Sequence, residues 1–102
     1  MKVLALGRDT APADDPRFPE VRPAEARRAW DLYQQGILRE IYFRVDRPNG
    51  VLILEVTDLA AARQVIDSLP LVAAGLIDFD LIALRPYPGF ARLFREDLHP
   101  GT

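Results

Sequence analysis

Carboxylates and arginines are the residues of this chain best suited to chemistry. Its 102 residues include 15 Asp and Glu, no cysteine, and one histidine, His99. The lack of cysteine excludes thiol nucleophiles, Cys-zinc sites and iron–sulfur clusters, and a single histidine excludes a metal site of several imidazoles. We therefore expect acid–base chemistry by carboxylates, anion binding by arginine, and no metal ion.

The spacing of these residues predicts that they gather on one face of a sheet. In the segment ILREIYFRVD (37–46), Glu40, Tyr42 and Arg44 alternate with apolar residues, so they would share one side of a strand. Two later segments, VLILEVT (51–57) and LIDFDLIALR (76–85), alternate in the same way. The predicted face collects the following polar residues: Glu40, Tyr42, Arg44, Glu55, Thr57, Asp78 and Asp80.

Double-bond migration beside a carbonyl is one reaction that this face could support. It needs a base, an acid, and a donor or cation for the dienolate oxygen. We predict Glu40 as the base, because partial burial beside Tyr42 and Leu38 would raise its pKa, and Tyr42 as the donor. The residues predicted to bind the substrate are Arg44, Glu55 and Asp78, with the Arg44 guanidinium suited to a carboxylate.

A simpler interpretation is that these carboxylates only pair with arginines, Glu40 with Arg44 above all. Both interpretations predict an oligomer, because Ile53, Ile82 and Leu84 would otherwise form an exposed apolar patch on the same face.

The elements that must position this face begin with a strand at 2–7. Pro12, Pro16 and Pro19 predict an irregular loop over 8–22. A helix is expected to begin at Pro23 and to end at Gly36. Its buried stripe is predicted to be Ala26, Ala29, Trp30, Tyr33 and Ile37.

The second half of the chain predicts a hairpin, a helix and a last strand. Asn49-Gly50 favours a tight turn with positive φ angles between the strands 37–46 and 51–57. Thr57 or Asp58 would cap a helix that Pro70 ends. The apolar sets predicted to face the helices are Ile41, Phe43 and Val45; Leu52, Leu54 and Val56; and Ile77, Phe79, Leu81 and Ala83. The order β-α-β-β-α-β is the α+β, ferredoxin-like pattern, a four-stranded antiparallel sheet with two helices on one face.

Composition limits the partners and the location. The chain has room for one domain, residues 1–102. A net charge of −2 argues against binding nucleic acid or an anionic membrane. No targeting segment, Walker motif or dinucleotide fingerprint is present, so we expect a cytoplasmic protein without a cofactor. The apolar residues of the segment 86–102 predict that it contacts a partner subunit or covers a pocket. His99 receives no role.

Three segments resemble the muconolactone isomerase-like family: LYQQGILREIYFR (32–44), SLPLV (68–72) and IDFDLIAL (77–84). The resemblance covers residues 24–86. It implies a ferredoxin-like fold whose protomers form dimeric α+β barrels and larger rings. It also implies a reaction that moves a double bond within a small lactone carboxylate, without a metal or organic cofactor, in aromatic-ring catabolism. Glu40 stands where the isomerases of this family carry a histidine.

Together these observations predict a cofactor-free isomerase that acts on a small anionic, oxygenated ring compound and assembles with itself. A cofactor-independent monooxygenase or cyclase of the same fold is one alternative. A non-catalytic, oligomeric small-molecule-binding protein is another. A closed pocket lined by Glu40, Tyr42 and Arg44 would favour an enzyme, whereas a flat, paired face would favour the non-catalytic protein.

Overall fold

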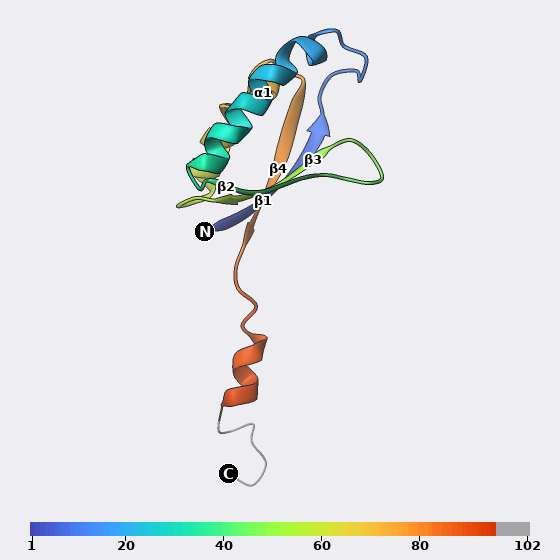
Figure 1. The fold of residues 1–102 in the computed structure, drawn as a ribbon. Coiled ribbons are helices and arrows are strands. Elements are labelled where there is room, and N and C mark those ends of the chain that lie inside the picture. Colours follow the sequence, from blue (N-terminus) through green and yellow to red (C-terminus); the bar gives the residue numbers. More distant parts are fainter. Residues whose placement is uncertain (96–102) are drawn as a thin grey trace.

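Segments of alternating apolar residues form four antiparallel strands in the computed structural model, which describes residues 1–95. The strands are β1 (Lys2–Asp9), β2 (Leu38–Phe43), β3 (Gly50–Glu55) and β4 (Ile77–Leu84). Their order in the sheet is β2-β3-β1-β4, and every neighbouring pair is antiparallel (Figure 1). The two edges of the sheet are therefore β2 and β4. This arrangement confirms the predicted ferredoxin-like fold.

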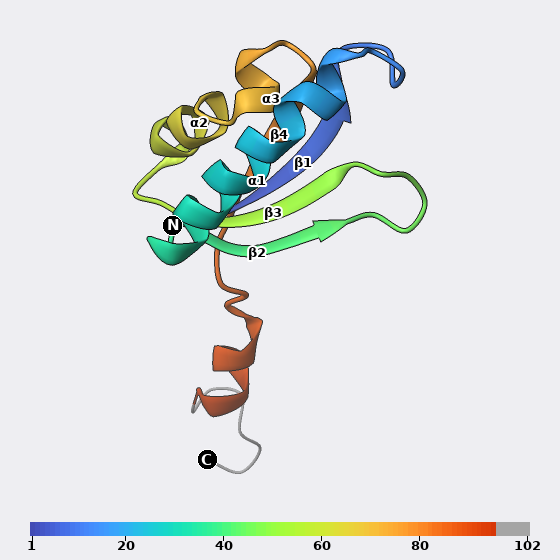
Figure 2. The same ribbon diagram turned by 45° about the horizontal axis from the view of Figure 1, so that its top comes forward.

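The helices all lie on one face of the sheet, and the other face is uncovered (Figure 2). They are α1 (Arg17–Gln34), α2 (Leu59–Asp67) and the short α3 (Pro70–Ala73). The predicted end signals are confirmed at two places. Gly36 follows α1 with a φ of 77°, which a residue without Cβ adopts freely. Asp58 caps α2, because its Oδ1 accepts a hydrogen bond from the Ala61 N–H at 2.8 Å.

The predicted loop over 8–22 is wrong at both ends. β1 continues to Asp9, and α1 begins at Arg17, where Asp15 Oδ1 accepts a hydrogen bond from the Arg17 N–H. Pro19 lies in the first turn, in which the backbone N–H has no partner within the helix. Pro23 lies inside α1 and removes one hydrogen bond without ending the helix.

The longer helix also changes which side of α1 is buried. Phe18 and Leu32 are buried, whereas Trp30 and Tyr33 are more than half exposed and stack on each other with ring centroids 5.7 Å apart. The prediction that both aromatic residues lie in the core is therefore wrong. At the other end of the molecule, Pro70 begins α3 instead of merely ending α2.

The core lies between the helices and one side of the sheet, which we name the inner face. Its fully buried strand residues are Val3, Ala5, Leu38, Leu52, Leu54 and Phe79. Two glycines make room for Phe79: a Cβ on Gly7 would lie 3.1 Å from the Phe79 ring and 3.0 Å from the Gly50 carbonyl oxygen. The inner-face predictions for β3 and β4 are thus confirmed at Leu52, Leu54 and Phe79.

β2 departs from simple alternation. A bulge between Leu38 and Glu40 pairs Leu38 with Leu54 and Glu40 with Ile53, so Leu38 enters the core. Beyond the bulge, Ile41 and Phe43 lie on the inner side, as predicted, but both are exposed at the edge of the sheet. The following hairpin does not form the predicted Asn49-Gly50 turn. Arg44 N–H donates to the Asn49 carbonyl oxygen instead, and neither Asn49 nor Gly50 has a positive φ.

Residues 85–95 leave the end of β4 and extend away from the sheet (Figure 1). We call this segment the arm. It contains a 3₁₀ helix, η1 (Gly89–Phe94), where the sequence predicted a short helix. None of its side chains is buried.

Candidate functional site

Glu40 and Tyr42 form the one pair of predicted site residues that the structure brings into direct contact. They are two apart on β2 beyond the bulge, so they lie on the same side of the strand. Tyr42 Oη donates a hydrogen bond to Glu40 Oε1 at 2.6 Å. Both side chains are exposed in the single chain. The burial that was expected from Leu38 is absent, because the bulge turns Leu38 into the core.

An apolar strip runs across the uncovered side of the sheet, which we name the outer face. The strand register places Ile53 beside Glu40, Leu4 beside Ile53, and Ile82 beside Leu4. A second row joins Tyr42 to Val51 and then to Leu6, in the same register. A ring compound on this strip would therefore rest on aliphatic side chains with Glu40 and Tyr42 at one end.

Arg44 does not take part in this arrangement. Its guanidinium makes a bidentate ion pair with Asp46, with Nε 2.9 Å from Oδ1 and Nη2 2.6 Å from Oδ2. The predicted Glu40–Arg44 pair is therefore wrong. The guanidinium belongs to the β2–β3 hairpin, and it holds the pKa of Asp46 below its usual range.

Asp78 lies on the opposite edge of the sheet from Glu40. Three strand spacings separate β2 from β4, about 14 Å at about 4.8 Å each. Asp78 Oδ1 accepts a hydrogen bond from Arg63 Nη2 of α2 at 2.6 Å, and Arg8 Nη2 lies 3.4 Å from Asp78 Oδ2. The Arg63 hydrogen bond holds the pKa of Asp78 low. A small substrate held by Glu40 would not reach this carboxylate.

Glu55 is also engaged elsewhere. Its Oε2 lies 2.9 Å from the Met1 ammonium group. That group lowers the pKa of Glu55 mainly through a hydrogen bond, and the charges of Arg39 and Lys2 lower it further. The structure thus separates Arg44, Glu55 and Asp78 from one another and from the Glu40–Tyr42 pair.

The hydrogen bond to Glu40 raises the pKa of Tyr42, because the phenol must lose the proton that it donates to a carboxylate. Tyr42 therefore keeps its proton at neutral pH and remains a donor. A carboxylate and a protonated phenol side by side can exchange a proton with a bound carbon acid and stabilise the resulting oxyanion.

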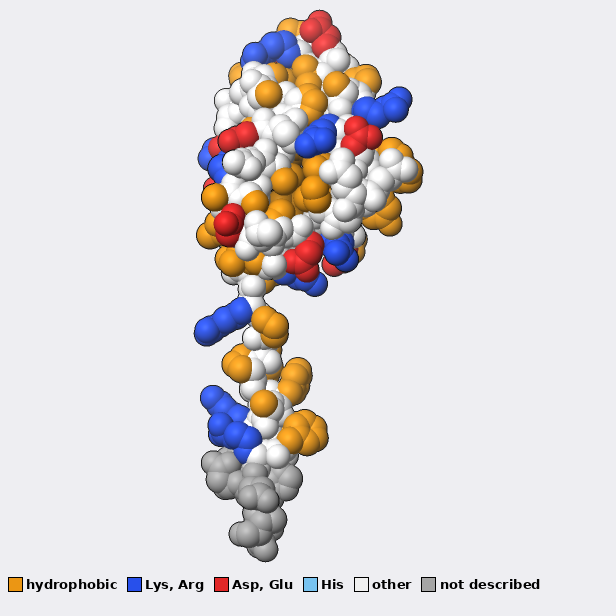
Figure 3. Space-filling view, turned by 90° about the vertical axis from the view of Figure 1, so that its left-hand side faces the viewer, with side chains coloured by type: hydrophobic (Ala, Val, Ile, Leu, Met, Phe, Trp, Pro, Cys, Tyr) orange, Lys and Arg blue, Asp and Glu red, His pale blue; other side chains and the backbone are white. Residues whose placement is uncertain are grey.

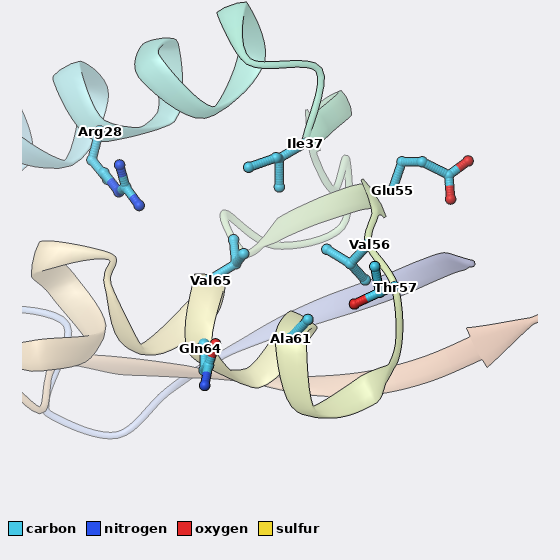
Figure 4. Close-up of a pocket in the computed structure, with 8 residues that line it drawn as sticks. All are labelled: Arg28, Ile37, Glu55, Val56, Thr57, Ala61, Gln64 and Val65. Atoms are coloured by element: carbon cyan, nitrogen blue, oxygen red, sulfur yellow. The ribbon is translucent and has the colours of Figure 1, made fainter.

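A groove of about 460 Å³ lies on the helix side, between α1, α2 and the end of β3. Figure 4 shows Arg28, Val65 and Ile37 around it, while the Glu55 side chain points away from the other lining residues. Arg28 Nε donates to Ser68 Oγ at 3.1 Å. The groove does not include Glu40 or Tyr42, so the predicted pocket around that pair is not formed by the single chain within residues 1–95.

Sequence reasoning missed the part that β1 plays in the outer face. Leu4 and Leu6 provide the centre of the apolar strip, and Arg8 binds the carboxylates of Asp78 and Asp80. The alternation in KVLALGRD (2–9) carries this signal, because Val3, Ala5 and Gly7 take the inner face. Arg63 could not have been found in this way, since its contact with Asp78 joins a helix to a strand.

The family model of muconolactone delta-isomerase matches residues 8–89 of this chain. The chain belongs to the muconolactone delta-isomerase family. A solved structure of muconolactone isomerase superposes with a TM-score of 0.73 at 20% sequence identity, covering 86% of this chain and 92% of that one. At this identity the likeness shows the shared fold. No curated protein matches the sequence.

Two further findings bear on partners and metals of this family member. In the part of the chain that the structure describes, no helix is long and apolar enough to cross a membrane. Among residues 1–95, no three His, Cys, Asp or Glu side chains lie together as a metal ion would require.

Proposed function

We propose that this protein is a cofactor-free isomerase that moves a double bond within a small anionic, oxygenated ring compound. The observation that supports it is the 2.6 Å hydrogen bond between Tyr42 and Glu40 at the end of an apolar strip. Membership of the muconolactone delta-isomerase family supports the reaction class. Following the family, we place this activity in the cytoplasm, in the breakdown of aromatic rings.

In this proposal Glu40 is the general base. Its carboxylate removes a proton from the carbon next to the ring carbonyl, and the electron pair moves onto the carbonyl oxygen as a dienolate. Tyr42 donates a hydrogen bond to that oxygen and otherwise holds Glu40 in place. The protonated Glu40 then returns the proton to a different carbon, so that the double bond has shifted and the side chain is a carboxylate again.

The outer face also needs a cover, because bulk water weakens every electrostatic interaction in an open site. We propose that a second copy supplies it, with the two outer faces packed against each other as a dimeric α+β barrel. The apolar strip supports this assembly, since aliphatic side chains on an open sheet face are typical of an interface. Light scattering should give at least twice the mass of one chain.

Glu40→Gln tests the reaction. A positioned general base typically contributes about 10²- to 10⁴-fold to the rate, and we expect a loss of that size with fold and mass unchanged. Glu20→Gln, an exposed carboxylate of α1, is the matched control and should leave the rate unchanged. The assay follows unsaturated five-membered lactones with a carboxylate side chain by ultraviolet absorbance in deuterated water. Deuterium should enter the product.

Activity should survive EDTA and the removal of oxygen. Oxygen uptake with turnover of a hydroxylated aromatic compound would instead support the monooxygenase alternative. Full activity of Glu40→Gln would exclude Glu40 as the base.

A further inference from the structure

The arm carries a cluster of apolar side chains that contact no other part of the chain's core. Tyr87, Phe90, Leu93 and Phe94 are between 66% and 79% exposed. Four large apolar side chains on one projecting segment form a patch that monomeric proteins rarely leave in water. The arm therefore has the composition of a segment that binds another surface.

The sequence of the arm keeps it extended from the body. Pro86 and Pro88 fix their own φ angles and restrict Arg85 and Tyr87 to extended conformations. The Tyr87 ring packs edge-on against Phe90 with centroids 5.1 Å apart. It also covers Gly89, where a Cβ would overlap the ring. The arm thus presents an arranged cluster of aromatic residues at a distance from its own sheet.

The arm is also basic. Residues 85–95 contain three arginines, Arg85, Arg92 and Arg95, and no carboxylate. Figure 3 shows the basic and the hydrophobic side chains of the arm largely on opposite sides of it. Its binding surface should therefore combine apolar side chains with a carboxylate.

The outer face at β2 offers that combination. Asp78 and Asp80 are bound by Arg8, and Glu55 is bound by the Met1 ammonium group. Within residues 1–95, Glu40 is the outer-face strand carboxylate without an ion pair, and Tyr42 is its hydrogen-bond donor. The apolar strip begins next to it at Ile53.

The strand order brings the arm to this place when two copies meet. β2 and β4 are the two edges of the sheet. If two outer faces pack about a two-fold axis that runs parallel to the strands, β4 of each copy lies over β2 of the other. The arm leaves β4 next to Leu84, at the end where Leu84 pairs with Lys2 and Lys2 with Glu55. Glu40 lies one row further in, beside Ile53.

We propose that the arm of one copy docks on the β2 edge of a second copy, where its aromatic side chains cover Glu40 and Tyr42 and Arg92 pairs with Glu40. A basic partner would keep Glu40 in its carboxylate form, and the aromatic side chains would exclude water from it. Each site would then be incomplete without the partner's arm. The docking is independent of the proposed reaction, because it can be measured without turnover.

Disulfide trapping tests the contact, and the absence of cysteine from the chain makes single-cysteine variants clean reporters. Ala91→Cys places a thiol on the arm, and Val51→Cys places one on the outer face opposite Tyr42. The two full-length variants, one of them isotope-labelled, are mixed and oxidised gently. We expect a mixed disulfide between labelled and unlabelled chains. Ala91→Cys mixed with Arg27→Cys, on the solvent side of α1, is the control and should give at least tenfold less.

A charge exchange tests the Arg92–Glu40 pair by sedimentation at several concentrations. Arg92→Glu should raise the dissociation constant of the dimer about tenfold or more, because it places two carboxylates together. Combining it with Glu40→Arg should restore the value to within about threefold. Arg47→Glu, which makes the same charge change in the exposed hairpin, should have little effect.

Three results would overturn the proposal. A chain that remains monomeric at all concentrations would assign the arm to a different partner. A disulfide that forms within one chain, in a variant carrying both Ala91→Cys and Val51→Cys, would show that the arm folds back on its own sheet. Equal effects of Arg92→Glu and Arg47→Glu would show that overall charge, and not this pair, governs association.

Discussion

The two faces of the same four strands have different requirements. On the inner face, Val3, Ala5 and Leu54 have no contact with solvent, because α1 and α2 cover them. On the outer face, their immediate neighbours Leu4 and Ile53 are only partly buried, and Ile82 is exposed. The chain completes the inner face by itself, whereas the outer face needs a partner to cover it.

The faces also differ in how they treat charge. The inner-face core contains no buried polar or charged residue in the described part of the chain. The outer face has carboxylates on all sides of its apolar strip, and most of them are bound by arginines or by the terminal ammonium group. Stability is therefore concentrated on one face, and the ionisable groups that could act on a ligand are concentrated on the other.

The largest effect that can break this comparison comes from two adjacent residues of β3. Leu54→Asp puts an unpaired charge into the core and should cost more than about 4 kcal/mol of unfolding free energy. Ile53→Asp puts the same charge on the outer face and should cost the single chain less than about 1 kcal/mol. Urea unfolding at low protein concentration measures both values.

The second arm of that experiment is the molecular mass. Ile53→Asp should abolish self-association at concentrations where the wild type is dimeric, because the charge lies in the apolar strip. If Ile53→Asp unfolds the chain and Leu54→Asp does not, the two faces have been assigned the wrong way round.

A smaller effect concerns the charged end of β4. The pKa of Asp78 is held below its ordinary value of 3.8 mainly by the Arg63 hydrogen bond. The carboxylate therefore stabilises the folded state above about pH 4, and this contribution is lost as the pH falls through the lowered pKa. Because Asp78 is partly exposed, we expect Asp78→Asn to cost only about 0.5–1 kcal/mol at pH 7.

The check is urea unfolding of wild type and Asp78→Asn between pH 7 and pH 2.5. The difference should shrink steadily below pH 4 and vanish at the lowest pH. Asp80→Asn, whose carboxylate lies 3.4 Å from Arg8, should show a smaller difference throughout. A difference that does not change with pH would mean that packing, and not charge, explains the loss.

The smallest expected effect sharpens the description of the outer face at β2. Glu40 raises the pKa of Tyr42 by accepting its hydrogen bond. Glu40→Gln should therefore lower the pKa of Tyr42 toward the ordinary value of 10.0. Titration of isotope-labelled tyrosine rings by nuclear magnetic resonance resolves Tyr42 from Tyr33 and Tyr87. Those two should titrate unchanged, and a common shift of all three would point to a general change in the fold.

Patterns within one segment were predictable from the sequence. Alternation placed Leu52, Leu54 and Phe79 on the inner face and put Glu40 beside Tyr42. The Asp58 cap and the stop at Gly36 follow from single residues whose chemistry suits those positions.

Features that depend on register or on distant partners were not predictable. The bulge at Arg39 reverses the side of Leu38, and no local pattern marks it. Trp30 and Tyr33 were assigned to the core because the start of α1 was placed six residues too late. The partners of Asp78, Arg8 and Arg63, come from segments far away in the chain, so only the assembled sheet and helix reveal why that carboxylate is occupied.

The contact among Gly7, Gly50 and Phe79 limits how relatives of this protein can vary. The Phe79 ring occupies the space that side chains at positions 7 and 50 would fill. An alanine at position 7 would meet both the ring and the Gly50 carbonyl oxygen, so it could be accommodated only with a smaller residue at position 79 or a wider separation of β1 and β3. Among homologous sequences these three positions should therefore covary in volume, a compensation that selection on either residue alone would not produce.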